Sequence, residues 1–134
     1  MLREPITYTD LNGESRTEDH YFNLTKAEIT KMQLGVDGGL SERLTKIKND
    51  NNIPEMIKFF EDLIRRSYGR KTTDGRFEKK SEYYEEFESS MAYSEFFMNL
   101  ISDADAAARF TNGIIPADLL AKVNEQQAKA LPAN

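Results

Sequence analysis

The segment from Ser90 to Ile101 constrains the fold of this chain more than any other stretch. Its apolar side chains recur at positions i, i+3, i+4, i+7 and i+8, which is the period of an amphipathic helix. These side chains are Tyr93, Phe96, Phe97, Leu100 and Ile101. Ser90 is placed to cap the start of the helix, and burying each aromatic ring contributes about 1.5–3 kcal/mol. We therefore predict a core helix here, with the other helices packed against it.

The composition is typical of an ordinary globular domain. The chain has 134 residues, of which 39% are hydrophobic and 31% charged, so we expect one domain with a real core. No run approaches the roughly 18 apolar residues of a membrane span. Residues 1–5 lack the apolar region of a signal peptide, so we expect synthesis without export and no membrane contact. The net charge of −5 argues against a nucleic-acid partner and suits a basic protein partner.

The first 24 residues predict a β-hairpin. Residues 5–9 and 15–22 are rich in β-branched and aromatic side chains, with turn residues between them. Asn12 and Gly13 suit a two-residue type I′ turn, whereas Asp10 and Gly13 suit a type I turn followed by a G1 bulge. The two registers place opposite faces of the second strand beside Ile6 and Tyr8, and the sequence leaves both open.

Residues 25–68 predict three helices. Thr25 and Glu28 form a capping box for a helix over residues 26–34, which Gly35 should end. A second short helix over residues 40–47 should be capped near Ser41. Pro54 then suits the first turn of a longer helix, whose apolar residues keep helical period up to residue 68.

Residues 70–127 predict a polar loop or small hairpin arm over 70–80, and then more helix. One helix opens at Ser81, a second is the aromatic segment, and a third begins near Asp103 and should end at Gly113. A last helix opens at Pro116. The fold expected is mainly α with an N-terminal β-hairpin (α+β), as a small single-domain helical bundle. Its hairpin spans residues 1–24, the helical body 25–127 and a flexible tail 128–134.

The sequence carries no catalytic signature. Zero cysteines exclude disulfides, thiolate zinc sites and thiol catalysis. His20 is the sole histidine, and we interpret it as a packing or surface residue. Asp103 and Asp105 are two apart and so do not share a helix face, which favours capping over metal binding. We expect no catalytic residue, cofactor or metal. Basic residues cluster between 65 and 80, as either a solvated face or an anion or partner patch.

Several blocks, read together, resemble a known family. They are Tyr8-Thr9-Asp10, Asn12-Gly13, Phe22 to Glu28, Ser67-Tyr68-Gly69, Asp74 to Phe77, Ala92-Tyr93-Ser94, Phe96 with Met98, Asp103 to Ala107 and Asn112 to Pro116. Their order and spacing resemble the tail assembly chaperones of long, non-contractile-tailed phages and prophages of Gram-positive bacteria. The resemblance extends from about Ile6 to Ala117.

The resemblance implies a non-enzymatic role in the host cytoplasm. Such chaperones engage the tape-measure protein and keep this long helical protein soluble while the major tail protein polymerises around it. The expected partner is therefore the tape-measure protein, with the major tail protein and a second copy of the chain as further candidates. Two alternatives stay open: a virion structural part, such as a head–tail connector or tail-tube accessory protein, and an acidic inhibitor of a host factor.

We predict the partner-binding surface on the last helix. A groove or stripe that binds a client helix presents anchors at i, i+3, i+4 and i+7. The aromatic helix is too buried for this, whereas the last helix has fewer neighbours to cover it. The predicted partner-binding residues are Ile114, Ile115, Leu119, Leu120 and Val123. The simpler alternative, that this face closes the core, also remains open.

Overall fold

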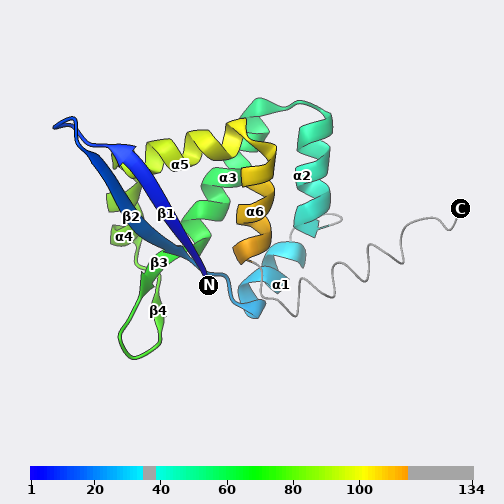
Figure 1. The fold of residues 1–134 in the computed structure, drawn as a ribbon. Coiled ribbons are helices and arrows are strands. Elements are labelled where there is room, and N and C mark those ends of the chain that lie inside the picture. The colour runs from blue at the N-terminus through cyan, green and yellow to red at the C-terminus, as the bar shows by residue number, and fades with distance from the viewer. Residues whose placement is uncertain (35–38, 115–134) are drawn as a thin grey trace, which may run out of the picture.

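The computed structural model describes residues 1–34 and 39–114 (Figure 1). The strands are β1 (Leu2–Thr9), β2 (Ser15–Phe22), β3 (Tyr68–Lys71) and β4 (Phe77–Glu78). The helices are α1 (Lys26–Leu34), α2 (Gly39–Asn49), α3 (Ile53–Ser67), α4 (Ser81–Glu88), α5 (Met91–Ser102) and α6 (Ala104–Ile114). This is the mainly helical α+β fold that the sequence predicts. No helix of the described residues is long and apolar enough to cross a membrane.

The strands form one antiparallel sheet in the order β1-β2-β3-β4. The chain leaves the sheet after β2, builds α1 to α3, and returns in β3, where Phe22 pairs with Tyr68. The polar segment 70–80 is a hairpin arm and not a loop: β3 and β4 pair, and the Thr72 N–H donates to the Arg76 carbonyl at 2.7 Å. The predicted hairpin is therefore half of a larger sheet that the helical body completes.

The N-terminal turn adopts the bulged register. Gly13 has φ +82°, and its N–H donates to the Asp10 carbonyl at 3.0 Å. Asn12 keeps a negative φ, which excludes the type I′ turn. The Asp10 carboxylate stabilises the loop by accepting from the N–H groups of Asn12 and Glu14 at 2.9 Å each. This register places Ile6 opposite Glu18.

β1 is the long free edge of this sheet. In an antiparallel pair, residues that bond the partner strand alternate with residues whose backbone groups face outward. Asp10 bonds Glu14 at the turn, so the outward positions along β1 are Thr9, Thr7, Pro5 and Arg3. Pro5 has no N–H, and it therefore interrupts the row of donors on the free edge, which is a common protection against strand pairing.

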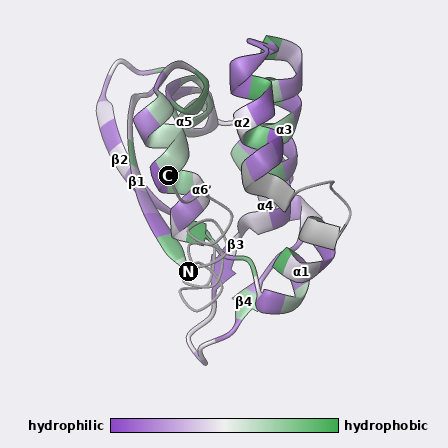
Figure 2. Ribbon diagram, turned by 90° about the vertical axis from the view of Figure 1, so that its right-hand side faces the viewer, coloured by the Kyte–Doolittle hydropathy of each residue, from purple (hydrophilic) through white to green (hydrophobic). Residues whose placement is uncertain are grey.

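The helices form two groups in the molecule. α5 and α6 lie against the β1–β2 hairpin, and α2 and α3 lie on the other side of the molecule (Figure 2). α5 contacts β1, α6, α3 and α4, as its aromatic stripe predicts, whereas α2 packs mainly on α3 and α1. The aromatic helix is thus a central element, but it shares that role with the strands.

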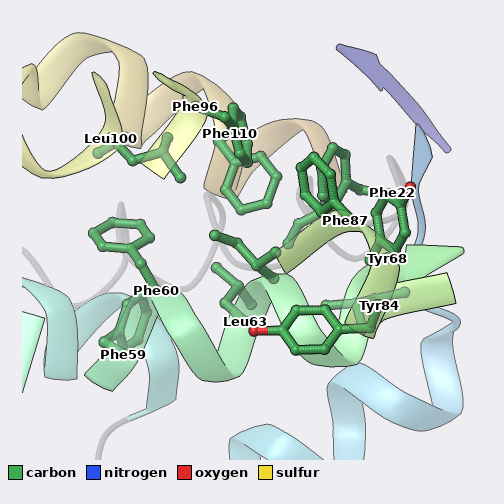
Figure 3. Close-up of a cluster of buried hydrophobic side chains, with 14 of the residues drawn as sticks. Phe22, Phe59, Phe60, Leu63, Tyr68, Tyr84, Phe87, Phe96, Leu100 and Phe110 are labelled. Atoms are coloured by element: carbon green, nitrogen blue, oxygen red, sulfur yellow. The ribbon is translucent and has the colours of Figure 1, made fainter. Parts of the chain in front are cut away.

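The core is an aromatic cluster around Phe22, which is fully buried on β2 (Figure 3). Its ring stacks on Phe96 of α5 at 5.2 Å between centroids and meets Phe110 of α6 edge-on at 5.1 Å. Phe87 of α4 stacks on Tyr68 of β3 at 4.4 Å and lies 6.1 Å from Phe22. Rings from five elements therefore meet where the sheet joins the helices.

Local signals place most of the helix boundaries correctly. The capping box forms as predicted: Glu28 accepts from the Thr25 N–H at 3.0 Å, and Thr25 Oγ1 accepts from the Glu28 N–H at 3.2 Å. Ser90 caps α5 by accepting from the Tyr93 N–H at 3.2 Å. α2 begins at Gly39, two residues before the cap expected near Ser41.

The predicted helix end at Gly113 is wrong, because α6 continues to Ile114. A Cβ at residue 113 would lie 2.9 Å from Leu2 Cδ1, so this glycine provides space for the start of β1. Close packing against another element accounts for the glycine better than a helix stop. The predicted stop at Gly35, the last helix from Pro116 and the tail over 128–134 lie outside the described residues.

Candidate partner-binding site

The predicted partner-binding stripe is described at one of its five positions. Ile114 is 2% exposed and belongs to the core cluster, packed at the end of α6. Ile115, Leu119, Leu120 and Val123 lie outside the described residues. Ile114 itself therefore offers no surface to a partner, and the rest of the stripe stays a prediction.

His20 is a packing residue. Its ring lies 4.5 Å from the Phe87 ring, and its side chain is 14% exposed. Nε2 lies 3.3 Å from Glu18 Oε1, and Nδ1 lies 3.1 Å from the Tyr68 hydroxyl. Because an ionised carboxylate can only accept, Nε2 donates to Glu18, and in the neutral ring Nδ1 accepts from Tyr68. The Nδ1–Tyr68 contact thus joins β2 to β3, and the Nε2–Glu18 contact fixes the ring within β2.

The charges around His20 are arranged to support this network. The Tyr8 hydroxyl donates to Glu18 Oε2 at 2.8 Å, and this bond lowers the pKa of Glu18 and raises that of Tyr8. Burial raises the pKa of Tyr68, so its hydroxyl keeps its proton at neutral pH. Burial also raises the pKa of Glu4, against the opposing charge of Arg109. Tyr8, Glu18, His20 and Tyr68 are thus joined by hydrogen bonds within the sheet.

Of the Asp103 and Asp105 pair, Asp103 caps a helix. Asp103 Oδ1 accepts from the N–H groups of Asp105 and Ala106 at 3.0 and 3.3 Å, so this carboxylate satisfies the first turn of α6. Among the described residues, no group of three or more His, Cys, Asp or Glu side chains is arranged to hold a metal ion.

One cleft, of about 440 Å³, opens between the end of α3, the β3–β4 arm and α4. The Tyr84 ring forms part of its wall, with the Arg65 guanidinium 5.5 Å above the ring centroid. The Tyr84 hydroxyl is buried and has no hydrogen-bond partner in the described part of the chain. Basic and acidic side chains share the rim, so the cleft has no strong preference for either sign of ligand charge. Its lining is Arg65, Tyr68, Lys79, Lys80, Ser81, Tyr84, Glu85 and Glu88.

The basic cluster over residues 65–80 is largely neutralised within the chain. Five of its seven Lys and Arg side chains form ion pairs at 2.5–3.6 Å. The pairs are Arg66–Asp62, Arg70–Glu86, Arg76–Asp74, Lys79–Glu28 and Lys80–Glu78. Of the two interpretations that the sequence leaves open, these contacts favour a solvated structural face over an anion-binding patch.

Residues 81–108 show the opposite arrangement. They contain no Lys, Arg or His, and their seven acids are Glu82, Glu85, Glu86, Glu88, Glu95, Asp103 and Asp105. Glu86 pairs with Arg70 and Asp103 caps α6, but no ion pair within the described structure includes the other five. Two methionines of α5, Met91 and Met98, are 43% and 55% exposed on the same segment. An acidic surface with exposed apolar side chains therefore covers α4 and α5.

A known protein family matches this chain. The model of the phage tail assembly chaperone family matches residues 1–134, the whole of the sequence. The chain belongs to this family. No curated protein and no solved structure matches it.

Sequence patterns alone did not predict the exposed acidic and apolar surface on α4 and α5 of this tail assembly chaperone. The spacing of the aromatic residues of α5 predicts a core helix and identifies its buried side. It does not indicate that Met91 and Met98 are exposed. The available signal is the absence of any basic residue over 28 consecutive positions from 81 to 108. Such a charge asymmetry within one domain indicates a surface whose counter-charges lie elsewhere.

Proposed function

We propose that this tail assembly chaperone binds the tape-measure protein of its phage during tail morphogenesis in the host cytoplasm, and that it acts without catalysis. The observation that carries the proposal is the family match over residues 1–134. The geometry supports it in two ways. His20 and Asp103 are the strongest candidates for catalysis or metal binding, but His20 packs within the sheet and Asp103 caps α6. The exposed acidic and apolar side chains of α4 and α5 suit protein recognition.

The test is coexpression with the tape-measure protein encoded in the same phage genome. We expect the tape-measure protein to remain in the soluble fraction and to copurify with an affinity-tagged chaperone, identified by mass spectrometry. Without the chaperone it should aggregate, because a long helical protein with apolar faces self-associates. An equally soluble tape-measure protein in both cultures, with no copurification, would contradict the proposal.

The C-terminal stripe is part of the same proposal. Ile115, Leu119, Leu120 and Val123 would contact the client, with Ile114 anchoring the stripe to the core. Changing Leu120 and Val123 together to Ser separates binding from packing. Weaker capture of the tape-measure protein at unchanged thermal stability supports the contact. A melting temperature lowered by several degrees, with unchanged capture per folded molecule, assigns the stripe to the core.

The competing function is that of a virion structural part whose hairpin extends a neighbour's sheet. Pro5 argues against this mode, since it interrupts the donors on the free edge of β1. Quantitative mass spectrometry of purified virions tests the choice directly. A chaperone should be absent or far below stoichiometric amounts, and stoichiometric presence would favour the structural role.

A further inference from the structure

The outer side of α5 presents one continuous line of exposed side chains. They are spaced at i, i+4, i+7 and i+11, which is the spacing of a coiled-coil seam. The four residues are Met91, Glu95, Met98 and Ser102, and all are exposed. We call this line the α5 seam. α5 lies along the upper border of the molecule in Figure 1, and its opposite side is buried through Ala92, Phe96 and Leu100.

The two methionines differ from the other exposed apolar residues of the chain. Among the described residues, the others are Met1 at the N-terminus, Leu11 in the turn after β1 and Ile53 at the start of α3, and none has a second exposed large apolar side chain on the same element. Met91 and Met98 are one heptad apart, or about 10.5 Å along the helix axis. Ile101 lies three residues beyond Met98 and is half-buried, so it widens the apolar surface on one flank. Methionine side chains are flexible and polarisable, and they suit a contact that must adapt to its partner.

The negative charge at the α5 seam favours a partner helix that carries basic residues. Glu95 lies between the two methionines, and residues 81–108 contain no Lys, Arg or His that could neutralise it locally. Glu95 forms no ion pair with any described residue. A helix that brings Lys or Arg beside Glu95 would gain an attraction that no ion pair with a described residue provides. An acidic helix would meet repulsion at the same place.

We propose that the α5 seam docks an amphipathic helix of the tape-measure protein that carries apolar residues at heptad spacing, flanked by Lys or Arg. This inference rests on the proposed function and names the surface and the chemistry of its client. The apolar residues pack against Met91 and Met98, and the basic residues lie beside Glu95. The contact is small and partly polar, which suits a client that is bound and later released.

The experiment uses the full chain and two synthetic helical peptides of about 21 residues, or three heptads. Both peptides have Leu at heptad positions a and d; one carries Lys at e and g, and the other carries Glu there. Binding is followed by fluorescence anisotropy. We expect the Lys peptide to bind about tenfold or more tightly than the Glu peptide at low salt, and the difference to shrink as salt is added. Equal binding of both peptides, or binding of neither, would overturn the inference.

Variants locate the contact. The double change Met91→Ser and Met98→Ser should weaken Lys-peptide binding about tenfold, and Glu95→Lys should reverse the peptide preference. Ile53→Ser and Glu14→Lys are matched controls, because they alter an exposed apolar and an exposed acidic residue away from α5. All five altered residues are exposed, so circular dichroism should show an unchanged fold. Seam variants that bind like the controls would assign the peptide to another surface and refute the α5 seam.

Capture of the tape-measure protein distinguishes the two levels of the proposal. If the wild type captures it and the methionine double variant loses capture, both hold. If both proteins capture it equally, the α5 seam is wrong while the proposed function stands. If the wild type captures none, the proposed function fails, and the client named for the seam falls with it.

Discussion

The neighbouring segments 65–80 and 81–108 differ in how many of their charged side chains form ion pairs with described residues. Each carries seven side chains of one sign, basic in the first and acidic in the second. Five of the seven bases are held by carboxylates of the same chain, three of them within four residues, namely Arg66–Asp62, Arg76–Asp74 and Lys80–Glu78. The acids have one such pair, Glu86 with Arg70, which also joins the two segments.

The difference shows why a run of like charges cannot be read as a ligand site from sequence alone. What matters is whether the fold supplies counter-charges, and some of these come from elements far apart in the chain, as when Glu28 of α1 reaches Lys79. The basic segment, which looks more like a binding patch, is neutralised by its own neighbours. The acidic segment, which looks like a core helix with polar spacers, has one ion pair with a described residue, Arg70–Glu86.

The largest loss of stability should follow from removing a core contact between the two segments. Phe87 of α4 stacks on Tyr68 of β3 at 4.4 Å and is 2% exposed. We expect Phe87→Ala to lower the free energy of unfolding by about 3–5 kcal/mol, because it leaves a cavity where both segments meet. Urea denaturation monitored by circular dichroism measures it, with Phe87→Leu as a milder control. A loss below about 1 kcal/mol would mean that the two segments are stabilised independently.

A smaller effect should follow from disturbing the basic arm alone. A Cβ at Gly69 would lie 2.4 Å from the Glu78 carbonyl oxygen, a backbone atom that cannot rotate away. Gly69→Ala should therefore cost about 1–3 kcal/mol. Gly113→Ala is the matched control, because its nearest contact is the flexible end of Leu2 and helix propensity favours alanine there by about 1 kcal/mol. Thermal melts of both variants check this, and equal melting temperatures would contradict the difference in contacts.

Much of the fold could be predicted from local sequence signals. The capping box at Thr25 and the cap at Ser90 act through bonds to residues three positions away, and Pro54 acts through its own fixed φ and missing N–H, so all three can be recognised without tertiary information. The turn register, the pairing of β2 with β3 and the role of Gly113 depend on distant partners. Gly113 was misread because a glycine that makes room for Leu2 looks the same in sequence as a helix stop.

The candidate site was harder to predict than the fold. Ile114 follows the apolar pattern expected of an exposed stripe, but the structure buries it, because burial depends on which element packs beside it. Met91 and Met98 are apolar residues of a core helix that face outward. Periodicity identifies the buried side of such a helix and says little about which apolar residues remain outside.

The pH dependence of stability should sharpen the comparison through Glu28. Lys79 Nζ lies 2.7 Å from both Glu28 carboxylate oxygens. Burial acts to raise the pKa of Glu28, but the bonds from Lys79 and Thr25 outweigh it and hold the pKa below its usual value. Because the folded pKa lies below the unfolded one, the stabilisation is fully present above the unfolded pKa of about 4.3 and is lost as pH falls through the folded pKa.

Lys79→Met removes the ion pair and keeps the aliphatic stem. Near pH 7 we expect this variant to be less stable than the wild type by about 0.5–1 kcal/mol, since both side chains remain partly exposed. The two stabilities should approach each other below pH 4. Urea denaturation at a series of pH values provides the measurement. Stability curves that stay parallel down to pH 3 would show that the pair does not set the pKa of Glu28.

The smallest effect, and the one with the opposite sign, should come from an acid of the second segment. Glu88 is the last residue of α4, where a negative charge opposes the helix dipole, and Glu85 lies three residues before it. Arg65 shares the cleft with Glu88, but no ion pair joins them, so the repulsion should outweigh the attraction. We expect Glu88→Gln to stabilise the fold by up to about 0.5 kcal/mol at low salt, and the gain to fade near 0.5 M salt as screening shortens the range of charge interactions. Arg70→Gln, which breaks the Arg70–Glu86 pair, is the control and should change stability in the other direction. If Glu88→Gln instead destabilised the protein by 1 kcal/mol or more, the acidic segment would be neutralised from within like the basic one, and the contrast between the two would fail.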